Sequence, residues 1–260
     1  MSTGEIIWVG FLASLFAGLG TGVGALGVFL VRRLSERLED GLLSFAAGIM
    51  LAASFLSLLL PGLEVAAEQY EHAVSAVAVV AAGFLAGAVA LSLVHRFAPH
   101  EHFQLGREGP ESSTLNRLWL FVIAITLHNF PEGMAVGVGF AGGDLENGRS
   151  LAAGILLQNI PEGLAVATSL LVIGYGRAQA FFIAFLTGLV EPVGGLFGSS
   201  MVSLAEPLMP WTLGFAAGAM VFIISDEVIP ETHRGAHAQS ATYALMVGIV
   251  VMLLLDSALP

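Results

Sequence analysis

Two short polar segments interrupt the apolar stretches in the middle of this sequence. They read LHNFPEG at residues 127–133 and LQNIPEG at residues 157–163. On a helix, positions i, i+1 and i+4 share one face. The residues that this rule places on a common face of each segment are His128, Asn129, Glu132, Gln158, Asn159 and Glu162. An imidazole, two carboxylates and three amides on buried faces could bind a cation.

Each polar segment also contains a proline, Pro131 or Pro161. Proline lacks an N–H and clashes with the carbonyl four residues earlier, so we expect both helices to bend and release a carbonyl beside the polar face. Discontinuous helices at matching positions of two halves are typical of a transporter binding site near the membrane midplane. A later segment, VEPVGG, adds a third carboxylate, Glu191, again followed by proline.

Three carboxylates inside apolar helices need a counter-charge. A charged group at the bilayer centre costs about 2.5 to 3.5 kcal/mol on insertion scales, and no Lys or Arg lies in these helices. A bound cation or protons could supply the charge. Imidazole with carboxylates and amides suits Zn²⁺, and also Fe²⁺, Mn²⁺, Co²⁺ and Cd²⁺, better than Ca²⁺ or Mg²⁺. Alternatively, these polar groups hydrogen-bond neighbouring helices, which explains the amides but leaves the carboxylates unpaired.

Composition places the chain in the membrane. Of 260 residues, 56% are hydrophobic and only 11% are charged, which is far from a soluble domain. Lysine and cysteine are absent, which excludes a phosphate-binding GxxxxGK loop, a thiolate metal site and disulfides. The net charge of −11 argues against nucleic acid as a partner, because binding it needs clustered basic residues.

The apolar runs predict an all-α membrane protein that forms a single transporter domain over residues 1–260. A spanning helix needs about 20 mostly apolar residues. We expect eight such helices, at residues 6–31, 42–63, 73–96, 117–141, 150–173, 178–204, 210–230 and 239–258. The longest connection, about 97–116, joins the third and fourth helices.

The arginines predict the orientation. Eight of the nine fall in the connections after the first, third, fifth and seventh helices, and only Arg149 lies on the other side. Basic residues favour the cytoplasmic side. We therefore expect a multi-pass protein of the inner (cytoplasmic) membrane, with residues 97–116 in the cytoplasm and both termini outside.

Internal similarity predicts an inverted repeat. Besides the two polar segments, FAAGIM at residues 45–50 resembles FAAGAM at residues 215–220. Both pairs match an even-numbered helix to an odd-numbered one, so the members cross the membrane in opposite directions. Helices 1–3 would then be related to helices 6–8, with helices 4 and 5 as a central pair.

HNFPEG and QNIPEG on adjacent helices, followed by a Glu-Pro on the next, resemble the ZIP (Zrt/Irt-like) family of divalent metal transporters, and most of all its GufA-like bacterial branch. The resemblance covers essentially the whole chain. It implies a metal site made of His128, Glu132, Gln158 and Glu162 with Met50 from helix 2. It also implies an adjacent second position with Asn129, Asn159 and Glu191, which shares the two glutamates. Some members carry an acid where Asn159 stands, so this second position has less negative charge here.

We therefore expect a carrier, not an enzyme, that moves a divalent metal into the cytoplasm as its transported substrate, and the resemblance implies that this metal is zinc. The expected partners are divalent metal ions and the lipid bilayer, and a homodimer is left open. An intramembrane zinc metalloenzyme is one alternative, but no HExxH pattern occurs. A proton-coupled carrier of a small organic cation is another, although only Phe130 supplies an aromatic ring near the motifs.

Two further groups of polar residues could serve the path of the ion. One lies at the expected cytoplasmic end of helix 7 and is either a receiving site for metal or a solvated helix end; it contains Asp226, Glu227, Glu231 and His233. The other is expected in the long cytoplasmic loop and contains His95, His100 and His102.

Overall fold

A computed structural model describes residues 1–98, 100–101, 107–108, 117–204 and 206–259 of the chain. The described residues form helices and one minimal hairpin. In chain order the elements are α1 (Thr3–Ala25), η1 (Leu26–Phe29), α2 (Glu36–Ala53), η2 (Ser54–Leu59), α3 (Leu60–Gln69), α4 (Ala73–Phe97), β1 (His100–Glu101), β2 (Arg107–Glu108), α5 (Arg117–Gly139), η3 (Ala141–Gly143), α6 (Leu145–Val172), α7 (Arg177–Gly188), α8 (Glu191–Leu204), η4 (Glu206–Leu208), α9 (Met209–Ile223), η5 (Ile224–Val228), α10 (Ile229–Thr232) and α11 (Ala238–Ala258). Strands β1 and β2 pair antiparallel, with His100 opposite Glu108. Most of the expected loop 97–116, including His102, lies outside the described residues.

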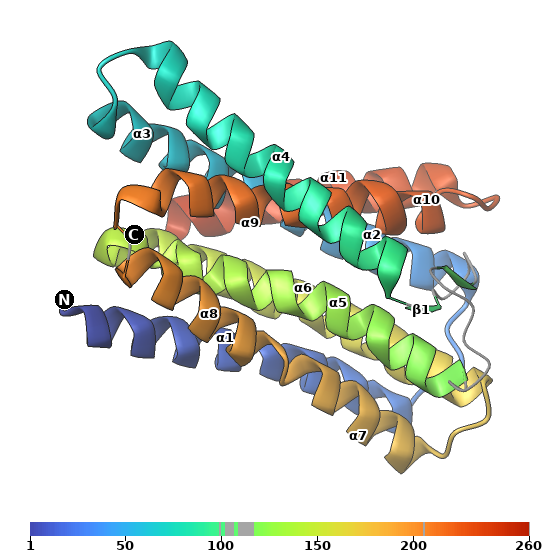
Figure 1. Ribbon diagram of the computed structural model, residues 1–260. Coiled ribbons are helices and arrows are strands. Elements are labelled where there is room, and N and C mark those ends of the chain that lie inside the picture. The colour runs from blue at the N-terminus through green and yellow to red at the C-terminus, as the bar shows by residue number, and fades with distance from the viewer. Residues whose placement is uncertain (99, 102–106, 109–116, 205, 260) are drawn as a thin grey trace.

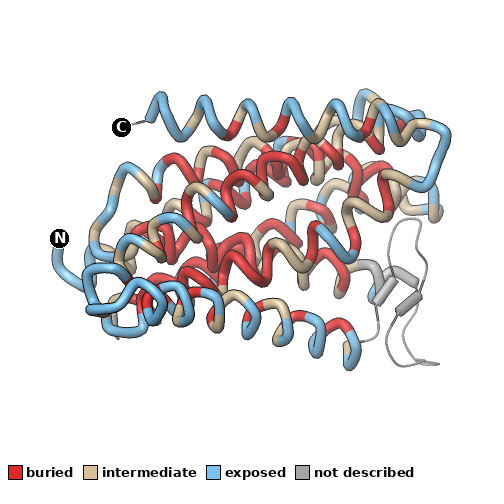
Figure 2. Tube along the Cα trace, turned by 90° about the horizontal axis from the view of Figure 1, so that it is seen from above, coloured by how far each residue is buried: buried red, intermediate tan, exposed pale blue. Residues whose placement is uncertain are grey.

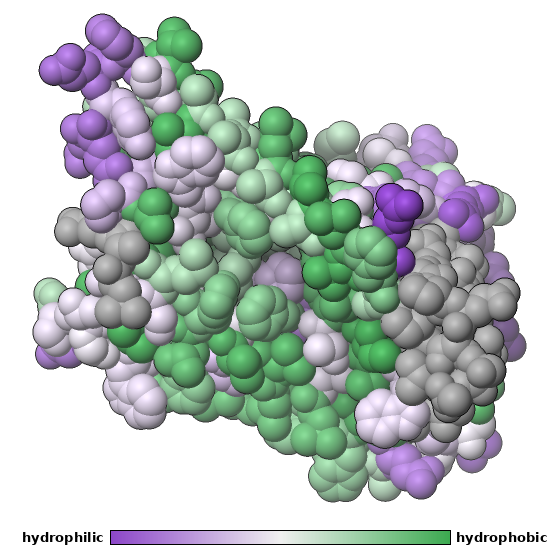
Figure 3. Space-filling model, viewed as in Figure 1, coloured by the Kyte–Doolittle hydropathy of each residue, from purple (hydrophilic) through white to green (hydrophobic). Residues whose placement is uncertain are grey.

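Seven helical segments of the described chain are long and apolar enough to cross a membrane. They are Thr3–Phe29, Glu36–Gln69, Ala73–Phe97, Leu145–Val172, Arg177–Ser203, Met209–Thr232 and Ala238–Ala258. Each corresponds to one of the expected apolar runs, and the remaining run contains α5, a helix of 23 residues. Apolar side chains cover the middle of the visible face, and polar ones gather toward the ends (Figure 3). The structure is that of a multi-pass membrane protein.

The helices form two layers (Figure 1). The first layer, which we call the α5–α6 layer, contains α1, α5, α6, α7 and α8; α1 packs on α6, and α5 packs on α8. The second, which we call the α2–α9 layer, contains α2, α3, α4, α9, α10 and α11; α4 packs on α9, and α2 packs on α11. The two ends of the chain lie at the same end of the molecule (Figure 1). Seen from above, buried residues gather in the middle of the bundle, and the outer helices are largely exposed (Figure 2).

The expected helix breaks at Pro131 and Pro161 are not observed. Helices α5 and α6 run without interruption through these prolines. Membrane helices tolerate proline where neighbouring helices hold the backbone, and both helices are packed against neighbours at this level. The interruptions lie in other spans. They are the π-helical turns η2 and η5 and a break at residues 189–190 between α7 and α8.

The two π-helical turns are each followed by a proline in the first turn of the next helix, Pro61 in α3 and Pro230 in α10. The residue before each proline still donates to the carbonyl five residues back, Leu60 to Phe55 and Ile229 to Ile224, and the proline then removes the next N–H. The carbonyl of Ser57, four residues before Pro61, accepts a hydrogen bond of 3.0 Å from the side-chain amide of Asn147 on α6. A side chain of the other layer therefore satisfies the carbonyl that the proline releases.

Candidate metal centre

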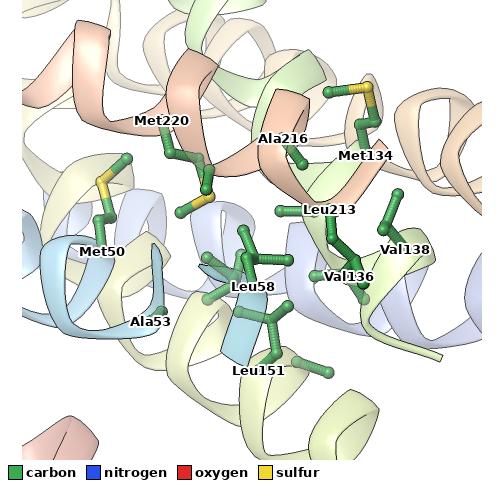
Figure 4. Close-up of a cluster of buried hydrophobic side chains, with 14 of the residues drawn as sticks. Met50, Ala53, Leu58, Met134, Val136, Val138, Leu151, Leu213, Ala216 and Met220 are labelled. Atoms are coloured by element: carbon green, nitrogen blue, oxygen red, sulfur yellow. The ribbon is translucent and has the colours of Figure 1, made fainter. Parts of the chain in front are cut away.

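The main apolar core and the polar motifs occupy successive levels of the same helices. Part of this core is shown in Figure 4, with side chains from α2, η2, α5, α6 and α9. Along α5, the core residues Met134, Val136 and Val138 follow Glu132 toward the end of the molecule where the termini lie. The polar level therefore lies on the other side of this core, toward the end that holds most of the arginines.

A cavity lies at this polar level between the two layers. It is lined by Leu43, Ala46, Ala47, Met50, His128, Glu132, Gln158, Glu162, Ile223, Glu227, Val228 and Glu231. We call it the His128 cavity. Its volume is about 40 Å³, and a water molecule needs roughly 10–15 Å³ on this measure, so the cavity has room for a metal ion with a few waters. The structure thus brings together all five residues that the resemblance implied for the first metal position.

The cavity carries polar atoms that have no hydrogen-bond partner. Within the described residues, neither carboxylate oxygen of Glu132 has one, and nor does the side-chain oxygen of Gln158. Both residues are fully buried. An unpaired buried polar atom costs free energy, and such atoms beside a cavity are what a bound cation would satisfy. In the described part of the chain, however, no three His, Asp or Glu side chains are already arranged to hold a metal ion, so ligands must turn to do so.

The residues of the expected second position form a separate group, which does not line the cavity. We call Asn129, Asn159 and Glu191 the Asn159 cluster; all three are fully buried. The amide nitrogen of Asn159 donates to Oε1 of Glu191 (2.7 Å) and to the carbonyl oxygen of Ala17 (2.9 Å). Its oxygen accepts a 2.7 Å bond from the amide of Gln158. Every polar atom of the Asn159 side chain is therefore engaged.

Glu227 joins the site, and its position distinguishes it from its polar neighbours. It lies in η5, is only 2% exposed and lines the cavity. Its Oε2 is 2.6 Å from Nε2 of His128. Glu231 is also buried in the cavity wall, whereas Asp226 is exposed. His233 contacts Thr232 and Thr242 instead. Of the four polar residues expected at this end of helix 7, two therefore line the cavity and two do not.

His95 was expected in a cytoplasmic loop, and that expectation is wrong. It lies in the last turn of α4, is 5% exposed, and its Nδ1 is 2.9 Å from Oε1 of Glu227. The sequence contained a signal for this. The buried residues of α4 are Ala76, Val80, Gly83, Gly87, Leu91 and His95. They follow a helical period of three to four residues, and His95 continues that buried stripe.

The glycine of each PEG motif permits the close packing of α5 and α6 on their neighbours. A Cβ atom at Gly133 would lie 2.0 Å from the carbonyl oxygen of Glu191 on α8. A Cβ atom at Gly163 would likewise lie 2.0 Å from the carbonyl oxygen of Thr21 on α1. No side chain fits at either place. These glycines set the distance of each polar helix from its partner, a role that the sequence reasoning did not assign.

The fold and the cavity define a membrane-embedded protein with a buried cavity lined by imidazole, carboxylate, amide and thioether groups. The family model described as ZIP zinc transporter matches residues 99–256. The chain belongs to this family. It is 47% identical over 250 residues to the zinc transporter GufA of Myxococcus xanthus, covering 96% of this chain and 98% of that protein.

Other relatives extend the similarity. The zinc transporter ZIPB of Bordetella bronchiseptica is 48% identical over 239 residues, covering 92% of this chain and 77% of that protein. The human zinc transporter ZIP11 is 33% identical over 331 aligned positions, covering 96% and 97%. The GufA-like resemblance is therefore confirmed. All three relatives are named transporters, so neither an enzyme nor a carrier of organic cations finds support among them.

Proposed function

We propose that this protein transports Zn²⁺ across the cytoplasmic membrane into the cytoplasm, with the ion as substrate in the His128 cavity. The observation that carries the proposal is a set of groups on the cavity wall that includes an imidazole, an amide, a thioether and two of the four wall carboxylates, from Met50, His128, Glu132, Gln158 and Glu162. The zinc transporter names of the relatives support the choice of ion. The same donor types also accept Cd²⁺, Fe²⁺, Mn²⁺ and Co²⁺.

One ion per chain suits the charges of the proposed site. Within the proposed ligand set, Glu132 and Glu162 together balance the two positive charges of one zinc ion, and His128, Gln158 and Met50 add neutral donors. Glu227 on the same wall contacts His128 instead. A second ion in the Asn159 cluster would have to replace the hydrogen bond between Asn159 and Glu191. Two divalent ions close together also repel strongly in a medium of low dielectric constant. The Asn159 cluster is therefore a polar support beside the path, empty of tightly bound metal.

Eight spans related by an inverted repeat form part of the same proposal. If helices 1–3 correspond to helices 6–8, and helix 4 to helix 5, then α1 corresponds to α8 and α6 corresponds to α5. The contact between α1 and α6 should then have a counterpart between α8 and α5. Likewise, α4 corresponds to α11 and α9 corresponds to α2, so the contact between α4 and α9 should have a counterpart between α11 and α2. All four pairs are in contact. The π-helical turns η2 and η5 each begin nine residues after the first phenylalanine of FAAGIM or FAAGAM. Both termini at one end of the molecule fit an even number of spans.

The proposed direction rests on the arginines and on the level of the cavity. By the preference of basic residues for the cytoplasmic side, the end of the molecule with the connections 30–35, 173–176 and 233–237 faces the cytoplasm. The cavity lies toward this end, and the apolar core separates it from the end with both termini. The described conformation would then receive or release an ion on the cytoplasmic side. The homodimer considered from the sequence stays a prediction.

Uptake into proteoliposomes tests the proposal. Purified protein reconstituted into vesicles should accumulate radioactive zinc faster than protein-free vesicles do, and unlabelled Cd²⁺ should compete, whereas Ca²⁺ and Mg²⁺ should not. Repeating the assay with a pH gradient of either sign measures the coupling to protons. Accumulation no faster than in protein-free vesicles would contradict the proposed function.

A further inference from the structure

Glu227 links two histidines that come from different helices. One carboxylate oxygen lies 2.6 Å from Nε2 of His128 on α5, and the other lies 2.9 Å from Nδ1 of His95 on α4. Both carboxylate oxygens are thus engaged by imidazoles. Phe222 packs its ring edge-on against His95, with 5.5 Å between ring centroids. These buried contacts hold Glu227 in one orientation.

The contact between His128 and Glu227 crosses from one layer of the molecule to the other. His128 belongs to the α5–α6 layer, while Glu227 and His95 both belong to the α2–α9 layer. Glu227 also lies in a π-helical turn, a feature that occurs often at functional sites because it turns a side chain out of the regular helical pattern.

A carboxylate next to a metal-binding histidine can act in two opposite ways. When it lies behind the ring, it orients the imidazole and strengthens metal binding, typically 10–100-fold. When it lies on the metal side, it occupies the nitrogen that the ion needs. Glu227 lines the same cavity as Met50, Glu132 and Glu162. His128 and Glu227 therefore meet at the wall of the space that the ion would enter.

We propose that Glu227, held in place by His95, competes with the transported ion for His128 and so speeds release of the ion from the cavity. This inference rests on the proposed function, because it concerns the same ion and the same cavity. His128 binds the ion through the nitrogen that contacts Glu227 in the described conformation. When the ion leaves, His128 returns to Glu227, and the contact ties the two layers together.

If Glu227 competes with the ion, removing its charge should raise the affinity for zinc. Removing a carboxylate from a cation site normally weakens binding, whereas removing a competitor strengthens it. A hydrogen bond with a charged partner is strong enough to shift an equilibrium by about tenfold. We expect purified Glu227→Gln protein to bind zinc about tenfold more tightly than the wild type does, and its maximal uptake rate to fall because release is slower.

Two matched variants serve as controls. Glu231→Gln removes the same charge from the wall of the same cavity and should weaken zinc binding. Asp226→Asn removes the charge next to Glu227, from an exposed side chain, and should leave the affinity unchanged. Circular dichroism and gel filtration establish that each variant is folded. Glu227→Ala, which cannot replace the hydrogen bond, should tighten binding at least as much as Glu227→Gln.

His95 is a positioning residue, and a double-mutant cycle identifies that role. His95→Gln should tighten zinc binding in the same direction as Glu227→Gln, because it loosens the competitor. In a Glu227→Gln background it should add nothing, since residues that act through one another are not additive. A role for His95 that is merely structural predicts weaker binding in both backgrounds.

A nuclear magnetic resonance measurement tests the contact without metal. With ¹⁵N-labelled histidine, metal-free protein should show a hydrogen-bonded Nε2 signal of His128 that is lost in Glu227→Ala and on addition of zinc. The competition is refuted if the wild type binds zinc but this signal is absent, or if Glu227→Gln binds zinc as well as or more weakly than the wild type does. In either case the proposed function stands. A wild-type protein that binds no zinc would refute both.

Discussion

The His128 cavity and the Asn159 cluster are neighbours built from the same two motifs, yet they satisfy their polar groups differently. In the cavity, both carboxylate oxygens of Glu132 lack a hydrogen-bond partner among the described residues. In the cluster, the amide of Asn159 donates to Oε1 of Glu191 and to the backbone of α1, whereas Oε2 of Glu191 and the amide of Asn129 lack a partner among the described residues. The first region leaves a whole carboxylate unpaired, whereas the second uses a neutral amide to hold one oxygen of its carboxylate. We infer from this comparison that the two adjacent polar positions need not both be ion sites.

The largest effect should follow the loss of the imidazole. Replacing His128 by alanine removes the only ring nitrogen that a zinc ion in the cavity could bind among its lining residues. We expect zinc uptake to fall by about 100-fold or more, because even residues outside the ligand set typically contribute 10–100-fold. Measurement of uptake in proteoliposomes, at equal amounts of inserted protein, provides the comparison. A variant that transports normally would show that the cavity is not the ion site.

The two regions should respond unequally to loss of a carboxylate. Glu132→Gln takes away a group that the ion would satisfy, so zinc affinity should fall strongly, by about tenfold or more. Glu191→Gln should change the affinity much less, because Glu191 contacts Asn159 and does not line the cavity. Titration of both purified variants with zinc measures the difference. Equal losses would mean that the Asn159 cluster also holds the ion.

A smaller effect is expected when the cluster is given the charge that it lacks. Asn159→Asp removes the donor to Glu191 and adds a negative charge, which a second ion could then balance. We expect weak additional zinc binding and uptake slower by a few fold, because an ion held there leaves more slowly. Asn159→Ser is the control, since it removes the same amide without adding charge. A second ion bound by the control as well would argue against the charge explanation.

Much of the site could be predicted because it is local in sequence. His128 and Glu132 share a helix, as do Gln158 and Glu162, and the helical period alone places each pair on one face. Met50 could be assigned only from the family resemblance, because a methionine in an apolar helix carries no local signal of binding. His95 was missed because it stands at the end of an apolar run and next to an arginine, where a loop was expected. Its buried position depends on the packing of α4 against α9.

The helix interruptions could not be located from prolines alone. Pro131 and Pro161 lie in uninterrupted helices, whereas Pro61 and Pro230 follow π-helical turns. Each of the four prolines removes one backbone N–H. What differs is the surrounding contact, such as the hydrogen bond from Asn147 to the carbonyl of Ser57, which joins residues far apart in sequence. The layered arrangement of the spans depends on such contacts as well.

Counting the ions bound per chain tests the central claim most directly. Purified protein saturated with zinc and freed of loosely held metal should retain one ion per chain, and Glu191→Gln protein should retain the same number. Elemental analysis against protein concentration gives the ratio. Two tightly held ions per wild-type chain, lost together in Glu191→Gln, would show that the amide of Asn159 does not prevent a second ion and that the distinction between the two regions is wrong.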